Sequence, residues 1–289
     1  MSAPSNAAAT PLMFRKLLGN IRSVRRNRRN GGCRVDCEHG RTDDGRLPWR
    51  TSEYGGWGGH EYHGTEPGAD RTPVVFVHGL GRDACDWHPH AEFFADWTYT
   101  GDELWAITFG SSIPTHETMA DQLEAFVSRV REHAGVETVS VVGHSLGVIG
   151  LRYWLHREDR YDWVEDFVGL AGPNHGTKLL SMAARHGIDS GAYRMSPVLR
   201  SDYERFGEHP LKELNREETP GDVEYYTVRG SEDPLFMACP GSPALEGAEN
   251  ALLETDHDGV RADLESIELV YEWVSGETPY DLGLLAESR

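Results

Sequence analysis

The feature that most constrains the fold is a segment in which a strand, a tight turn and a helix follow one another. Residues 138–142 are apolar and β-branched, as in a buried strand, and residues 146–157 have the pattern of a helix. Between them, residues 143–147 read Gly-His-Ser-Leu-Gly, a Gly-x-Ser-x-Gly motif. So tight a turn brings the residues two before and two after the serine together, which requires glycine at both. The serine hydroxyl then stands above the sheet edge at a helix N-terminus, where developing negative charge is favoured.

Strands and helices alternate along most of the chain from residue 73 onward. Short apolar runs predict strands, and apolar residues at helical spacing predict amphipathic helices. The expected strands lie at 73–77, 104–109, 138–142, 167–171, 224–229 and 251–254, and the expected helices at 116–134, 146–157 and 260–275. This alternation indicates an α/β fold with a mostly parallel central sheet flanked by helices.

The domain organisation follows from where this alternation begins, breaks and ends. We expect a basic, disordered tail over residues 1–35 and a loop-rich lead-in over 36–72 that contains a short edge hairpin. The α/β domain is expected over 73–276, followed by a C-terminal tail at 277–289. Residues 173–222 interrupt the alternation with a segment of about 50 residues that is polar overall. Because so long an insertion in a compact domain is usually functional or mobile, we expect it to form a cap.

The charge balance is unusual. The 289 residues include 47 Asp and Glu against 28 Lys and Arg, a formal net charge of −19, and only three of the basic residues are Lys. Carboxylates stay hydrated where salt competes for water, and their mutual repulsion is screened when the Debye length falls to about 3 Å at 1 M salt. We therefore expect a halophilic protein; an ordinary acidic protein is the alternative.

The basic tail bears on location and partners. It carries eight basic residues and no acid, and no 7–15-residue apolar stretch follows them, which argues against a secretory signal. With no apolar run near the ~20 residues of a membrane span, we expect a cytoplasmic protein. An alternative to a disordered tail is an interfacial helix that makes weak contact with a membrane surface. Its apolar face would comprise Phe14, Leu17, Leu18, Ile21 and Val24.

Neither the cysteines nor the histidines form a convincing metal motif. The cysteines form no CxxC pair or dense framework, so free thiols are expected. They are Cys33, Cys37, Cys85 and Cys239. His88 and His90, with Asp83 and Asp86 before them, suggest a cation site, but a solvated acidic loop is the favoured interpretation. We expect no metal and no cofactor.

Nucleophilic catalysis by Ser145 would need an acid and a histidine, which follow in the order Ser, acid, His in this arrangement. A carboxylate is expected at the carboxyl end of the strand 224–229. Asp233 is the expected acid, with Glu232 and Asp222 as alternatives. His257 follows a predicted strand and precedes the last helix, and it is therefore the expected base.

These residues predict acyl transfer through a covalent intermediate. His257 would take the proton from Ser145 as it attacks a carbonyl and then protonate the leaving alkoxide, while Asp233 orients the imidazole. Two backbone N–H groups should stabilise the oxyanion. We expect them to be those of Leu146, after the serine, and of Leu80, in the loop after the first parallel strand.

Three motifs together carry a resemblance to a known family. Residues 78–81 read His-Gly-Leu-Gly, residues 143–147 hold the serine motif, and residues 171–177 read Ala-Gly-Pro-Asn-His-Gly-Thr. In order and approximate spacing they resemble small microbial lipases and esterases of the α/β-hydrolase fold, over roughly residues 72–275. The last motif is the narrowest and is similar to triacylglycerol lipases.

The resemblance implies a carboxylic ester hydrolase that acts on small esters or lipids, with a role in lipid metabolism. His175, in the last motif, precedes the acid, so we expect a loop residue there. Since the insertion 173–222 is more polar than an apolar lid, esterase is favoured over true lipase. Alternatives are an acyltransferase or thioesterase with the same triad, or a non-catalytic binding protein on this scaffold. No nucleic-acid partner is expected.

Overall fold

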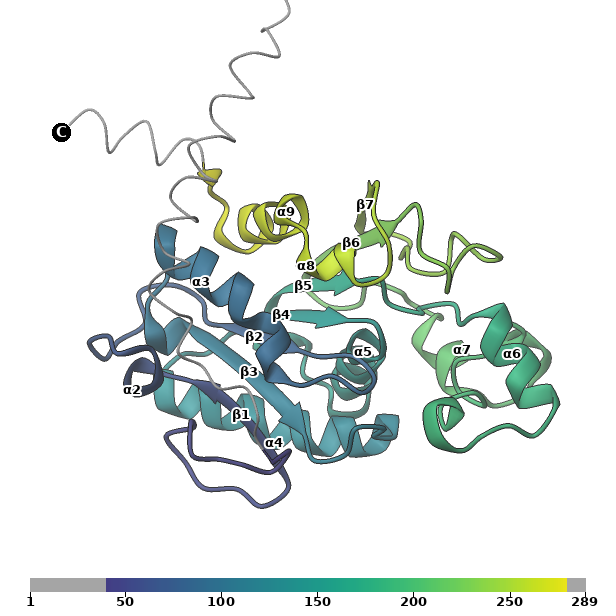
Figure 1. The fold of residues 1–289 in the computed structure, drawn as a ribbon, viewed down its shortest axis with the longest axis horizontal. Coiled ribbons are helices and arrows are strands. Elements are labelled where there is room, and N and C mark those ends of the chain that lie inside the picture. Colours follow the sequence, from purple (N-terminus) through teal and green to yellow (C-terminus); the bar gives the residue numbers. More distant parts are fainter. Residues whose placement is uncertain (1–39, 280–289) are drawn as a thin grey trace, which may run out of the picture. The chain divides into compact units, whose positions relative to one another are not determined.

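The computed structural model describes residues 40–279, which form a seven-stranded sheet with helices on both faces (Figure 1). The strand order is β1-β3-β2-β4-β5-β6-β7, with β1 antiparallel to β3 and all other neighbours parallel. The strands are β1 Tyr54–Gly58, β2 Val74–Val77, β3 Leu104–Phe109, β4 Val139–His144, β5 Val164–Leu170, β6 Glu224–Gly230 and β7 Glu249–Leu253. The expected tail over residues 1–35 lies outside the described residues.

Two apolar clusters hold the helices against the sheet. Val75 and Val77 face one cluster, which includes the apolar sides of α4 and α5. Val74 and Phe76 face the other, under α3 and α9. All four side chains are fully buried, as expected for a parallel strand covered on both faces. The helices are α2 His60–His63, α3 His88–Trp97, α4 His116–Ala134, α5 Leu146–Glu158, α6 Lys178–Arg185, α7 Pro210–Leu214, α8 Gly259–Ala262 and α9 Leu264–Ser275.

All six predicted strands and the predicted helices 116–134 and 146–157 are confirmed, with small shifts at some ends. The expected helix 260–275 is divided, because Asp263 adopts an extended backbone (φ −76°, ψ 145°) between α8 and α9. Helix α3 had no counterpart in the sequence prediction. The expected edge hairpin in residues 36–72 is wrong: this region contributes one strand, β1, whose partner is β3.

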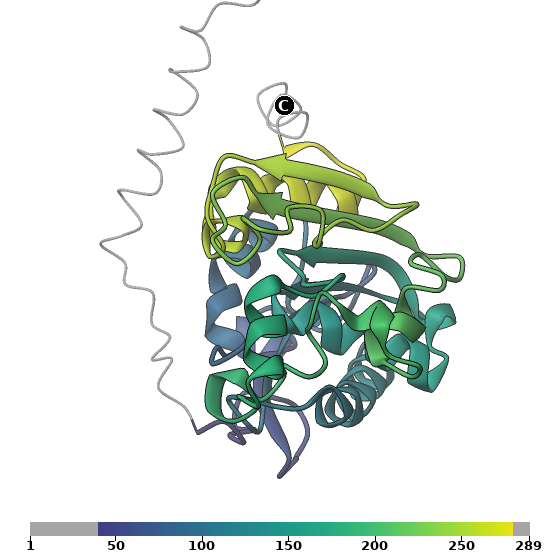
Figure 2. The same ribbon diagram turned by 90° about the vertical axis from the view of Figure 1, so that its right-hand side faces the viewer.

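The insertion 173–222 contains α6 and α7 joined by short helical turns. Figures 1 and 2 show both helices beyond the carboxyl ends of β4 and β5, on the side of the sheet where Ser145 follows β4. The insertion therefore lies where it can border a substrate bound at the serine.

The cysteines differ from the expectation of free thiols. Cys239 is a free thiol, but Cys85 is disulfide-bonded, so that expectation is wrong for Cys85. Within residues 40–279, none of the helices combines the length and the apolar character needed to cross a bilayer.

Candidate active site

Ser145 occupies a strained turn between β4 and α5. Its backbone has φ 54° and ψ −121°, a conformation that a residue with a side chain rarely adopts. The flanking glycines make this turn feasible. A Cβ on Gly143 would lie 3.2 Å from the carbonyl carbon of Gly147, and a Cβ on Gly147 would lie 2.6 Å from the carbonyl oxygen of His78. The predicted requirement for glycine at both positions is confirmed.

Three side chains from three separate loops converge at this turn. His257 Nε2 lies 2.9 Å from Ser145 Oγ, and His257 Nδ1 lies 2.6 Å from Asp233 Oδ2. Asp233 follows β6 and is buried, whereas His257, between β7 and α8, has a side chain one-quarter exposed. The carboxylate accepts a hydrogen bond from Nδ1–H, which leaves the lone pair of Nε2 free to accept the serine proton. The arrangement can therefore generate a serine nucleophile.

The two alternative acids lie elsewhere. Glu232 and Asp222 are both exposed, and Asp222 precedes β6, at the opposite end of the strand from Asp233. Asp233 also accepts a hydrogen bond from the amide of Leu235 at 2.9 Å, so both of its oxygens are engaged. Of the carboxylates considered from the sequence, the structure brings only Asp233 to His257.

His78 fixes the loop after β2. Its Nδ1 donates to the carbonyl of Gly79 at 2.7 Å, and its Nε2 accepts from the amide of Phe109 at 3.0 Å. Burial lowers the pKa of His78 to about 4, so the ring is neutral. Because the Gly79 carbonyl points toward His78, the next amide in the same trans peptide, that of Leu80, points the other way.

That loop lies directly against the nucleophile. A Cβ on Gly79 would be only 3.0 Å from Ser145 Cβ, so glycine permits the close approach. Among the described residues, the amide of Leu80 donates no hydrogen bond. Leu146 begins α5, where first-turn amides lack intrahelical acceptors. Both groups expected from the sequence thus remain available to a ligand at Ser145.

His144, the residue before the serine, was missed by the sequence analysis as a site residue. Its Nε2 donates to the backbone carbonyl of His257 at 2.9 Å, which ties the end of β4 to the loop after β7. Burial, followed by the neighbouring His257, holds the pKa of His144 well below its ordinary value, so the ring stays neutral. The only sequence signal was its place inside the serine motif.

His175 holds the start of the insertion, as its position before the acid led us to expect. Its Nδ1 lies 3.1 Å from the carbonyl of Ser242 and its Nε2 lies 2.8 Å from Glu218 Oε1. Within residues 40–279, neither Ser145 nor Asp233 forms a hydrogen bond with this ring. It joins the insertion to the loop between β6 and β7.

The cation site considered at His88 and His90 does not assemble. His88 Nε2 bonds the Tyr62 hydroxyl at 2.8 Å, whereas His90 is buried with no hydrogen-bond partner for either ring nitrogen in the described part of the chain. Burial lowers the pKa of His90 to about 3. Asp86 lies instead between Arg82 and Arg261, 3.6 and 3.7 Å away.

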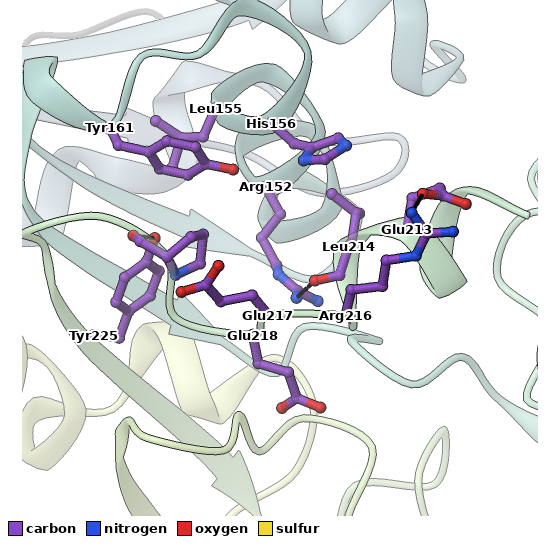
Figure 3. A pocket seen from close by; sticks show the side chains of 11 residues that line it. Arg152, Leu155, His156, Tyr161, Glu213, Leu214, Arg216, Glu217, Glu218 and Tyr225 are labelled. Atoms are coloured by element: carbon purple, nitrogen blue, oxygen red, sulfur yellow. Dashed lines mark hydrogen bonds and ion pairs between the residues drawn. The ribbon is translucent and has the colours of Figure 1, made fainter.

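A cavity lined by both charged and apolar side chains lies beside α5, where the insertion meets the core (Figure 3). Arg152 is buried there and donates to the carbonyl of Leu214 at 2.9 Å, joining α5 to α7. Burial lowers its pKa to about 10. Glu213, Glu217 and Glu218 also line the cavity, which contains none of Ser145, Asp233 or His257. We interpret it as a junction between cap and core.

The comparison with known proteins agrees with this architecture. Residues 71–190 match the family model of class 2 lipases. The solved structure of Aspergillus fumigatus lipase B aligns with 74% of this chain and 54% of its own, with a TM-score of 0.53 and 15% identity. The chain has the α/β-hydrolase fold.

Two curated relatives match parts of this chain. A triacylglycerol lipase of Pseudomonas fragi is 29% identical over 113 residues, which is 38% of this chain and 37% of that protein. The dihydrolipoyllysine-residue acetyltransferase component of an acetoin cleaving system, from Cupriavidus necator, is 36% identical over 81 residues, 28% of this chain and 21% of that one. The chain therefore spans well under half the length of either relative.

Proposed function

We propose that this α/β-hydrolase is a serine hydrolase that cleaves carboxylic esters through an acyl-enzyme on Ser145. The observation that carries the proposal is the chain of contacts from Ser145 to His257 at 2.9 Å and from His257 to Asp233 at 2.6 Å. The match to class 2 lipases supports the same reaction class.

In the proposed reaction, His257 removes the hydroxyl proton as Ser145 Oγ attacks the ester carbonyl, and the carbonyl oxygen becomes an oxyanion. The amides of Leu80 and Leu146 donate to that oxygen. His257 then protonates the departing alkoxide, which leaves an acyl group on Ser145. Water attacks this acyl-serine with His257 again as base, which releases the acid and restores the serine.

The substrate class is proposed from the surface of the insertion. Helix α6 exposes Leu179 and Met182, at 49% and 57%, and Met237 beyond Asp233 is 77% exposed. The insertion is polar in composition, but Leu179 and Met182, three residues apart on α6, give this helix an exposed apolar face. We propose that residues 173–222 cap the site of a domain over 73–276, and that this face contacts the acyl chain of a small ester or lipid.

Labelling with a fluorophosphonate tests the nucleophile. The reagent should modify Ser145 alone and abolish hydrolysis of a p-nitrophenyl ester, while Ser145→Ala should lose both labelling and turnover. Ser128→Ala, on α4, is the matched control and should keep both. Labelling of another serine, or full turnover by Ser145→Ala, contradicts the proposal.

The acetyltransferase match raises acyl transfer as a second candidate, since the same acyl-serine can react with another acceptor. The two functions differ in what attacks the acyl-enzyme. Release of free acid at the same rate with and without added alcohol or thiol acceptors supports hydrolysis. Acyl products that replace free acid at millimolar acceptor would favour transfer.

The salt adaptation and the cellular location of the protein are also proposals. The excess of carboxylates and the three Lys residues support a halophilic protein. The cytoplasmic location expected from the sequence must be reconciled with the disulfide at Cys85, because disulfides are rare in reducing compartments. Cell fractionation tests the location. Co-sedimentation of vesicles in high salt, with the full chain and a version starting at residue 36, tests the proposed weak membrane contact of the tail.

A further inference from the structure

Two imidazoles and a buried carboxylate converge at the amino-terminal edge of the sheet, the opposite edge from Ser145. His60 begins α2, Asp102 lies in the helical turn just before β3, and His133 lies in the last turn of α4. His60 Nδ1 lies 2.9 Å and His133 Nε2 3.1 Å from the same oxygen, Asp102 Oδ1. These three atoms all lie within 4.8 Å of one another.

Four nitrogens surround the carboxylate of Asp102. Its Oδ1 faces three of them, because the backbone amide of His60 lies 2.8 Å away in addition to the two ring nitrogens. Its Oδ2 accepts from the amide of Gly68 at 2.7 Å and also lies 3.0 Å from His60 Nδ1.

The geometry carries the inference. Two imidazole nitrogens converge on one carboxylate oxygen, and both atom types are ligands of divalent transition metals.

We propose that His60, Asp102 and His133 bind one divalent transition-metal ion, of which Zn²⁺ fits best. Zn²⁺ is bound by imidazole nitrogen and carboxylate oxygen at about 2.0–2.1 Å in a tetrahedral arrangement, which sets neighbouring ligand atoms about 3.3 Å apart. The separations of 2.9 and 3.1 Å approach that value. The side chains of both histidines are 25% exposed, so solvent can reach the fourth position.

The surroundings favour a structural role. The amides of Gly68 and His60 orient the carboxylate, as outer hydrogen bonds commonly do for metal ligands. The ring of Trp105 packs 5.4 Å from that of His133 and covers one side. The ion would join the segment after the edge strand β1, the turn before β3 and the end of α4. It would therefore fasten the antiparallel edge of the sheet to the helix layer.

Zinc titration of the full-length protein, stripped with chelator, tests the proposal. Competition with a chromophoric indicator should give one tight equivalent per chain, and the thermal midpoint should rise with zinc. His133→Gln keeps an N–H that can bond Asp102 but supplies a poor ligand, so it should bind zinc at least tenfold more weakly and lose the zinc-dependent rise. His186→Gln, an exposed histidine after α6, is the matched control and should behave as the parent.

Three results overturn the proposal: no stoichiometric zinc binding by the parent, equal binding by His133→Gln, or an equal fall in the midpoint of His133→Gln with and without zinc. The last would assign the cluster to hydrogen bonding alone. Turnover of a short-chain ester, measured in parallel, should be unchanged in His133→Gln and shows that the variant is folded. The zinc readouts do not depend on the proposed ester hydrolysis, so the two proposals can fail separately.

Discussion

The replacement Asp233→Asn tests the role of the buried acid. Both carboxylate oxygens are engaged: one accepts from the Leu235 amide at 2.9 Å, and the other accepts from His257 Nδ1 at 2.6 Å. Asparagine offers only one oxygen for these two donors. If the amide nitrogen faces His257, the ring must carry its proton on Nε2 and can no longer accept the proton of Ser145.

If the amide nitrogen faces Leu235 instead, two buried N–H groups oppose each other, at a cost of about 1–3 kcal/mol. The side chain of Asp233 is fully buried, so water cannot relieve the conflict. In either orientation the anion that stabilises the imidazolium is gone. We therefore expect kcat to fall by about 10⁴-fold, the loss known for this change in serine proteases and equal to about 5.5 kcal/mol.

Initial rates with a short-chain p-nitrophenyl ester measure kcat, and thermal unfolding verifies that the variant is folded. Glu232→Gln is the matched control, because it neutralises the adjacent, exposed carboxylate and should leave kcat within about twofold. Retention of more than a tenth of the parent kcat by Asp233→Asn would refute the reasoning. An equal loss of kcat in Glu232→Gln would also refute it, because Glu232 would then be a candidate for the acid that pairs with His257.

The remaining predictions concern stability and substrate choice. Gly147→Ala should lower the free energy of unfolding by about 3 kcal/mol in urea titration, because its Cβ would meet the carbonyl oxygens of Val77 and His78 at 2.7 and 2.6 Å; an unchanged midpoint would contradict this. Burial raises the pKa of Asp166 to about 6, so its ionisation destabilises the folded state increasingly as pH rises from about 4 to above 6. Asp166→Asn should therefore stabilise the protein by up to about 3 kcal/mol at pH 8 but not at pH 4, and equal gains at both would be inconsistent. Leu179→Ser with Met182→Ser should raise KM for long-chain esters and spare short-chain ones, whereas a uniform change would argue against acyl contact. The thermal midpoint should rise between dilute buffer and multimolar KCl, and equal midpoints would rule out salt-dependent folding.

The parts of the fold that the sequence predicts are those with a clear apolar pattern, and β1 shows why others escape. Its residues read Tyr-Gly-Gly-Trp-Gly, a composition typical of a loop. The glycines are required by the close approach of the next strand: a Cβ on Gly56 would lie 2.2 Å from the carbonyl oxygen of Ala106. Only the paired structure reveals that reason, because the partner residue lies 50 positions away in the sequence.

The candidate site was likewise predictable only where the sequence carries a clear signal. Chain order and strand ends were enough to select Ser145, Asp233 and His257 as residues that meet. No periodicity marks His60, Asp102 and His133, which lie 42 and 31 residues apart and meet only because three chain segments end at one edge of the sheet. His144 is likewise adjacent to the serine in the chain, but its partner is a carbonyl 113 residues away.

Two kinds of contact hold the loops around Ser145, and they respond differently to salt. Arg82 and Asp258 pair across the loops that follow β2 and β7, but these side chains are 40% and 56% exposed. Such a pair contributes about 0–1 kcal/mol and is screened at molar ionic strength.

The bonds from His78 to Gly79 and from His144 to the His257 carbonyl are made instead by buried, neutral rings. Burial keeps both imidazoles uncharged, so salt has no ionic interaction to weaken there. If the protein works in concentrated salt, as its composition suggests, the geometry around Ser145 depends more on these two neutral hydrogen bonds than on the ion pair between Arg82 and Asp258.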